Sequence, residues 1–252
     1  MIKNTIKFQV WFVCLILLPT YALTGTEKTA EITLNATQDT SIIIQPKSQM
    51  KNQSKNYSAG GNPSLVCSNI GSVFFVAFDT FNTFEELQIL NPKQIVSVEI
   101  SLYCLNSAFK TPQQIIVRRV LLPWKEGKQK FTLAEKNDLT FNSCLHQNLT
   151  WNTPPAQAML KGINGDRPSD YNGSEDVSHR VDAVLKIEGP KQRYVWKGNF
   201  VTSAFQFWLA NPDYNYGHLF ALRDGSETVK FASREHPNPE FRPTLTIFYK
   251  KN

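Results

Sequence analysis

The sequence predicts an all-β protein: an antiparallel, jelly-roll-like β-sandwich with one short helix in its C-terminal part. Three observations support this fold class. Short runs of residues alternate between apolar and polar, clusters of Asn, Gly and Pro separate these runs, and one stretch near the C-terminus carries helical periodicity. A chain of 252 residues is long enough to bury one core of this kind.

The clearest predicted strand runs from Ile95 to Tyr103. Every second residue in it is apolar: Val96, Val98, Ile100 and Leu102. Such alternation is typical of an antiparallel strand with one buried and one solvated face. We expect further strands at residues 31–34, 41–45, 64–68, 73–78, 114–121, 219–223, 229–233 and 244–249.

The predicted helix covers Thr202 to Ala210. Its apolar residues follow the i, i+3, i+4, i+7 spacing of one helix face: Val201, Ala204, Phe205 and Trp208. We therefore expect Trp208 to be buried against the sandwich. The stretch 156–179 is rich in Gly, Asn and Pro and predicts a long loop at the sandwich edge.

Six short motifs follow one another along the chain: Ala36-Thr37-Gln38-Asp39, Asn56-Tyr57 before Gly60-Gly61, Phe78-Asp79, the strand Ile95 to Tyr103, Trp124-Lys125-Glu126-Gly127 and Thr150-Trp151-Asn152-Thr153-Pro154. The predicted helix, two strands, Arg242-Pro243 and a last strand complete the series. This order resembles the DNRLRE domain, an extracellular β-sandwich counted among carbohydrate-binding modules. The resemblance covers nearly all of residues 23–252 and implies one sandwich domain with a basic, hydrophilic patch for an anionic polysaccharide.

The sequence departs from the family pattern in three places. The hexapeptide that names the family does not occur literally. The helix entry reads Asn199-Phe200-Val201-Thr202 instead of Asp-Val-Thr, and Phe131 to His146 is extra length. These departures bear on binding specificity more than on the fold.

Residues 1–22 predict a secretory signal. Lys3 and Lys7 precede an apolar run from Phe8 to Leu18, and Thr20 and Ala22 supply the small residues of a cleavage site. The run is about half of the ~20 apolar residues that a membrane span needs. We expect residues 23–252 to be secreted, extracellular or at the cell surface, without a stable membrane span, and an uncleaved anchor is the alternative.

The net charge is mildly basic. It falls from +6 to +4 when Lys3 and Lys7 leave with the signal. This charge fits either ordinary solubility or attraction to an acidic polymer. Nucleic acid is not an expected partner, because the chain is predicted to be secreted and shows no DNA- or RNA-binding motif.

The expected mature chain keeps Cys67, Cys104 and Cys144, an odd number for an oxidising compartment. One disulfide with a free thiol, or three reduced cysteines, both fit the spacing. Cys104 has the same parity as the apolar residues of its strand, which favours a role as a small buried hydrophobe.

No catalytic arrangement is evident in the sequence. The four histidines are scattered without metal-ligand spacing, which favours solvated positions: His146, His179, His218 and His236. Two carboxylate pairs are imaginable for a glycosidase, Glu126 with Asp166 and Glu85 with Glu86, but sequence does not show their separation. No cofactor motif occurs. A structural calcium is an open alternative, with Asp39, Asp79 or Asp213 as candidate ligands.

The candidate ligand-binding residues are basic and aromatic: Lys47, Lys51, Lys55, Tyr57, Arg118, Tyr214 and Tyr216. The lysines follow a predicted strand, and the tyrosines lie among turn formers, where a ring can cover the apolar face of a sugar. Arg118 and Arg119 are adjacent, so only one can lie on an open face. The four tryptophans within the resembled framework are expected to be buried: Trp124, Trp151, Trp196 and Trp208.

The leading hypothesis is a secreted, non-catalytic module that binds an acidic, uronate-type polysaccharide through a shallow basic face with tyrosines at its rim. The alternative is a structural or adhesive surface protein that uses the sandwich as a scaffold and its odd cysteine between chains. A glycan-cleaving enzyme is the third hypothesis, based on fold analogy alone.

Overall fold

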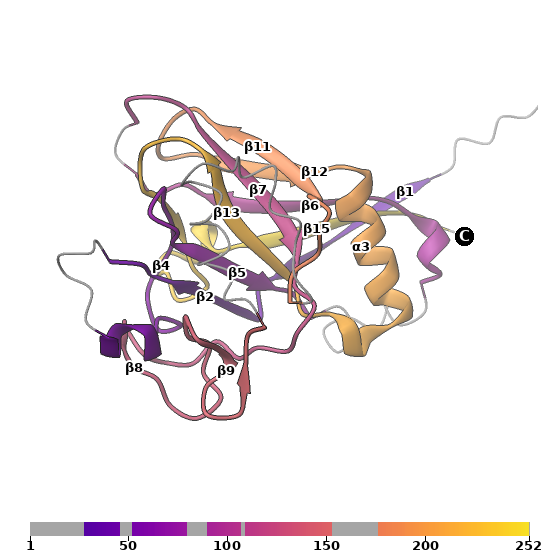
Figure 1. The fold of residues 1–252 in the computed structure, drawn as a ribbon. Helices are drawn as coiled ribbons and strands as arrows, with labels where there is room; N and C mark the ends of the chain where they lie inside the picture. Colours follow the sequence, from indigo (N-terminus) through magenta and orange to yellow (C-terminus); the bar gives the residue numbers. More distant parts are fainter. Residues whose placement is uncertain (1–27, 46–51, 80–89, 107–108, 153–175, 252) are drawn as a thin grey trace, which may run out of the picture.

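The structure, a computed structural model, describes residues 28–45, 52–79, 90–106, 109–152 and 176–251 (Figure 1). The predicted secretory signal lies outside these residues, as do Lys47, Lys51 and most of the predicted loop 156–179. No helix within these ranges is both long and apolar enough to cross a membrane.

Two antiparallel sheets pack face to face (Figure 1). The first sheet has four strands in the order β1 (Thr29–Asn35), β15 (Thr244–Lys250), β6 (Ile95–Tyr103) and β12 (Arg193–Lys197). The second sheet has five, in the order β11 (Ala183–Ile187), β7 (Gln113–Arg119), β13 (His218–Asp224), β5 (Val73–Ala77) and β2 (Gln38–Ile42). The predicted all-β sandwich is therefore confirmed.

Shorter elements surround the two sheets. Three small ladders pair β4 (Ser64–Cys67) with β14 (Val229–Ala232), β3 (Tyr57–Ser58) with β8 (Thr132–Leu133), and β9 (Ser143–Leu145) with β10 (Leu149–Thr150). The helical elements are η1 (Asn52–Asn56), η2 (Pro92–Gln94), α3 (Asn199–Ala210), η4 (Pro212–Tyr214) and η5 (Pro239–Phe241).

The main core fills the space between the two sheets. Phe74 and Phe220 of the second sheet stack with ring centroids 4.8 Å apart, and Trp196 of the first sheet meets Phe220 edge-on at 5.4 Å. α3 contributes Val201 and Phe205 to the same core. Large aromatic side chains contribute most to such cores because each removes about 150–250 Å² from water.

The second sheet is buried on its other face as well. Its alternate residues, such as Phe75, meet Trp124 and Trp151 from the segment 121–152. All four framework tryptophans are buried, as predicted. The segment 121–152 therefore forms a third layer over the sheet, and its loops lie at the end of the molecule that carries β8 and β9 (Figure 1).

The start of β6 departs from the predicted alternation of buried and exposed residues. β6 begins and ends as predicted, but Val96 is 49% exposed while Ile95 is buried. The pairing with β15 shifts at this point, so that Tyr249 opposes Ile95 and Val96 is the extra residue of a bulge. The bulge turns Ile95 inward in place of Val96.

The helix starts earlier than predicted, at Asn199, and ends at Ala210 as expected. Trp208 is buried, and its ring meets the imidazole of His218 edge-on at 4.9 Å. Thr202 fixes the helix to the first sheet, because its hydroxyl accepts a hydrogen bond from the backbone N–H of Val98 at 3.2 Å.

Candidate functional site

Two adjoining hollows lie over the turn that follows Trp124. They have volumes of about 480 and 450 Å³ and share Gly127, Lys128 and Arg234. Lys130 completes the rim of the first hollow and Lys125 that of the second. We call this double hollow the lysine groove, defined by Lys125, Lys128, Lys130 and Arg234.

Close contact between two backbone turns forms the floor of the groove. A Cβ atom on Gly60 would lie 2.3 Å from the carbonyl oxygen of Glu126, and one on Gly61 would lie 2.2 Å from that of Lys128. Gly127 has φ +75°, a conformation that favours glycine. The glycines therefore let the chain segments approach closely, and they leave bare backbone at the bottom of the groove.

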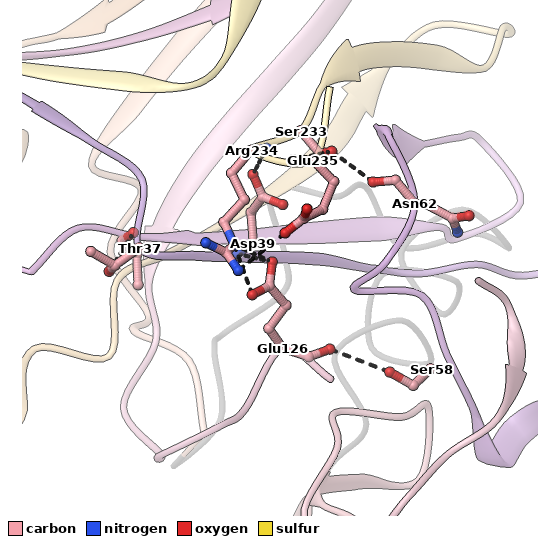
Figure 2. A network of polar contacts seen from close by, with 9 residues as sticks. Thr37, Asp39, Ser58, Asn62, Glu126, Ser233, Arg234 and Glu235 are labelled. Atoms are coloured by element: carbon pink, nitrogen blue, oxygen red, sulfur yellow. Dashed lines mark hydrogen bonds and ion pairs between the residues drawn. The ribbon is translucent and has the colours of Figure 1, made fainter. Parts of the chain in front are cut away.

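Three residues that are far apart in the sequence, Asp39, Glu126 and Arg234, meet beside the groove (Figure 2). Arg234 directs its Nε to both carboxylate oxygens of Glu126, at 2.9 Å each, and its backbone N–H donates to Oδ2 of Asp39 at 2.6 Å. The backbone N–H of Asp39 donates to Oε1 of Glu126 at 3.0 Å. These bonds connect β2, the turn after Trp124 and the loop after β14.

Burial changes the acidity of both carboxyl groups. The pKa of Asp39 is raised well above its ordinary value by burial and then by the neighbouring charge of Glu126. Burial also raises the pKa of Glu126, although the hydrogen bond from Arg234 opposes this rise. Perturbed carboxyl groups beside a cleft mark a candidate functional site. Both carboxylate oxygens of Glu126 are nevertheless engaged by Arg234, so the arrangement is a structural crosslink.

The charges that face solvent around the groove are mostly positive. Lys125, Lys128 and Lys130 are exposed, and none of them forms an ion pair with another described residue. Four acidic residues line the groove: Glu126 and Asp138 are buried, whereas Glu135 and Glu235 are exposed. The exposed charges are therefore three unpaired lysines and Arg234 against two carboxylates, one of which, Glu235, pairs with Arg234, so the groove can attract an anion through its lysines.

Two predicted ligand residues lie in the chain shortly before the groove-lining Gly60. Lys55, in η1, is half-buried with its ammonium 5.7 Å from the ring centroid of Phe141. Tyr57 is half-buried with its ring edge-on to Phe131 at 5.3 Å, and it precedes the groove-lining Gly60 by three residues. Sequence analysis missed Lys125, Lys128 and Lys130 as ligand candidates, although Lys125 lies inside the Trp-Lys-Glu-Gly motif.

Arg118 is not on an open face, contrary to the prediction. It is 2% exposed and donates hydrogen bonds to the carbonyl oxygens of Ser178 and His179. The neighbouring Arg119 is more exposed and lies 3.6 Å from the carboxylate of Asp182. The prediction was wrong because the segment with Ser178 and His179 lies over this side chain.

The other two predicted tyrosines are not at the rim of the groove. Tyr214 is exposed in η4, where its ring contacts Phe207 of α3. Tyr216 is half-buried against the outer core, and its carbonyl oxygen accepts a hydrogen bond from Nε1 of Trp124 at 2.7 Å. None of the three predicted tyrosines is among the described residues that line the two hollows.

His218 is also not solvated, contrary to the prediction for all four histidines. It is buried in β13, 3.8 Å from the carboxylate of Asp182, and burial lowers its pKa to about 3. The imidazole is therefore neutral at physiological pH.

Of the candidate calcium ligands, Asp39 belongs to the crosslink, while Asp79 and Asp213 lie elsewhere. The described part of the chain has no group of three acidic, His or Cys residues that suits a metal ion.

Cys67, Cys104 and Cys144 are all free and buried. Cys67 pairs with Val229 and Cys104 bridges to Phe231, so β14 lies between the two cysteines. Two strand spacings, about 9.5 Å, exceed the reach of a disulfide. The prediction that Cys104 is a small buried hydrophobe is confirmed, and none of the three described thiols is at the surface for a bond between chains.

No family model matches this chain, and it has no significant match among curated proteins. The resemblance to the DNRLRE domain therefore stays a prediction.

Proposed function

We propose that this protein binds an anionic extracellular polysaccharide, without catalysis, in the lysine groove. The observation that carries the proposal is the excess of exposed positive charge there: Lys125, Lys128 and Lys130 face solvent without an ion-pair partner among the described residues, whereas two of the four acids that line the groove are buried. An extended acidic chain would lie along the two hollows, with its carboxylates near the ammonium groups. Tyr57, whose ring contacts Phe131 directly after Lys130, would extend the same contact surface.

Arg234 would contribute in a different way from the lysines. Glu126 binds its Nε, and Glu235 lies 3.1 Å from its Nη2. The side chain is nevertheless 39% exposed and lines both hollows. A guanidinium that is fixed in this manner loses little freedom on binding, and such preorganisation favours recognition of a carboxylate.

Isothermal titration with a polyuronate at about 0.1 M and about 1 M salt tests the proposal, because exposed charge contacts are screened at high salt. The variant replaces Lys125, Lys128 and Lys130 by Ala. Each exposed contact contributes about 0.5 kcal/mol, so the three together should weaken binding about tenfold. The melting temperature should change little, since exposed lysines contribute little to folding.

A matched control replaces Lys93, Lys110 and Lys230 by Ala, which removes the same charge from exposed lysines outside the groove that also form no ion pair with a described residue. A second variant replaces the predicted trio Lys47, Lys51 and Lys55. The proposal fails if the groove variant and the control bind the polyuronate equally well, or if the unaltered protein does not bind it. The latter result favours the structural or adhesive alternative.

A further inference from the structure

The helix α3 has two apolar faces: the inner face packs into the core, and the outer face is exposed. Residues 200, 203, 207 and 210 share this outer face, and η4 continues the line to residue 214. All five are exposed: Phe200, Ser203, Phe207, Ala210 and Tyr214. Phe200 is 46% exposed, Phe207 44% and Tyr214 60%. We call these five residues the aromatic strip.

The rings of the strip are not equally accessible. The guanidinium of Arg180 lies 4.1 Å from the ring centroid of Phe200 and covers one of its faces. Phe207 and Tyr214 remain, with ring centroids 6.2 Å apart and planes inclined at 56°. Two inclined rings do not match the flat surface of a crystalline polysaccharide. They can instead contact successive sugar units of a single flexible glycan chain.

The dimensions and charge of the strip limit what can cover it. Three aromatic side chains that are about half exposed offer roughly 300 Å². A stable protein interface needs about 800 Å² from each partner, so a second copy of this chain is a poor occupant. α3 carries no charged residue, whereas helices that bind membrane surfaces carry Lys or Arg on their polar face.

We propose that the aromatic strip is a second carbohydrate site, which takes a soluble, uncharged glycan chain through Phe207 and Tyr214. An aromatic ring covers the apolar face of a pyranose while the sugar hydroxyls stay in water, and such contacts need no charge. The strip lies on the opposite side of the molecule from β8, which adjoins the lysine groove (Figure 1). The site is therefore independent of the proposed polyuronate site and would make the protein bivalent.

Titration calorimetry of the full-length chain with cellohexaose and xylohexaose tests this inference. The variant Phe207→Ala/Tyr214→Ala should weaken binding of at least one hexasaccharide by about tenfold or more, to an equal extent at about 0.1 M and about 1 M salt. The variant Tyr214→Phe keeps the ring and should bind nearly normally. Polyuronate binding by the groove should be unchanged in both variants.

Leu133→Ala/Val184→Ala is the matched control, because it removes two exposed apolar side chains from β8 and β11 instead of from α3 and η4. It should leave hexasaccharide binding unchanged. The inference is overturned if neither hexasaccharide binds the unaltered protein, or if the double Ala variant binds as well as the control. It is also overturned if sedimentation shows a dimer that the double Ala variant abolishes, since a second copy would then occupy the strip.

Discussion

Glu126→Ala should destabilise the protein by about 2–3 kcal/mol. The change leaves the backbone N–H of Asp39 buried without its acceptor, which costs about 1–3 kcal/mol. It also removes the ion pair with Arg234, whose contribution is only ~0–1 kcal/mol because that side chain is 39% exposed. Relief of the repulsion with the carboxyl of Asp39 offsets a small part of this loss.

Differential scanning calorimetry at neutral pH provides the measurement. For a chain of this size, each kcal/mol lowers the melting temperature by about 2–4 °C, so a decrease of roughly 4–12 °C is expected. Glu135→Ala is the control, since this exposed acid lines the same hollow without entering the crosslink. A Glu126→Ala variant that melts within about 1 °C of the control would refute the reasoning.

A double-mutant cycle with Arg234→Ala separates the two contributions. If the backbone hydrogen bond to Asp39 dominates, the coupling energy between Glu126 and Arg234 should be about 1 kcal/mol or less. Glu126→Gln retains one oxygen that can accept from the Asp39 N–H, and it should therefore be less destabilising than Glu126→Ala. A Gln variant as unstable as the Ala variant would show that the charge matters most.

Trp208→Ala should cost ~3–5 kcal/mol in chemical denaturation, as core aromatic truncations do, while Phe207→Ala on the exposed face should cost less than ~1 kcal/mol. Asp39→Asn should become stabilising relative to the parent as pH rises from about 4 to about 8. A carboxyl group whose pKa is higher in the folded than in the unfolded state stabilises the fold at low pH, and this contribution is lost as the pH rises and the group ionises. Melting curves of both proteins across this pH range measure the sign of the stability difference. The native thiols should react with a thiol reagent only after unfolding, and burial raises the pKa of Cys144 to about 11. Gly127→Ala should lower the melting temperature, because its Cβ would lie 2.6 Å from side-chain atoms and its φ is positive.

The alternation of the sequence predicted most strands of the two large sheets, including the edge strand β1, and it missed two other edge strands. β11 and β12 were not predicted, and each lies at the end of its sheet. The burial of β11 is partial, with Val184 exposed, so its apolar pattern is weak. An edge strand pairs on one side only, and its side chains need not be apolar.

β2 shows a second limit of pattern reading. It was predicted at residues 41–45 but occupies Gln38–Ile42, and it buries Asp39, Thr40 and Ser41. Distant backbone groups bind two of these three side chains. The hydroxyl of Ser41 accepts from the backbone N–H of Val66, and the carboxylate of Asp39 accepts from that of Arg234. Such buried polar residues give no apolar alternation, and no local pattern in the sequence reports a contact 195 residues away.

The candidate site was only partly predictable for the same reason. The loop with Lys55 and Tyr57 was recognised from its composition, whereas the groove beside it needs the turn after Trp124 and the loop after β14. The parity argument for Arg118 and Arg119 was correct in placing them on opposite faces. The prediction for Arg118 failed because the sequence does not reveal that the distant segment with Ser178 and His179 covers this side chain.

The groove places two kinds of charge close together, and their effects should be separable. Asp39 and Glu126 are buried, hold Arg234 and connect three chain segments, so changes to them should act on stability first. Lys125 and Lys128 are exposed and hold nothing else in place among the described residues, so changes to them should act on binding alone. Arg234 belongs to both groups. An Arg234→Lys variant keeps the charge but cannot reproduce the fixed fork, and it should therefore reduce polyuronate affinity more than its small effect on folding would explain.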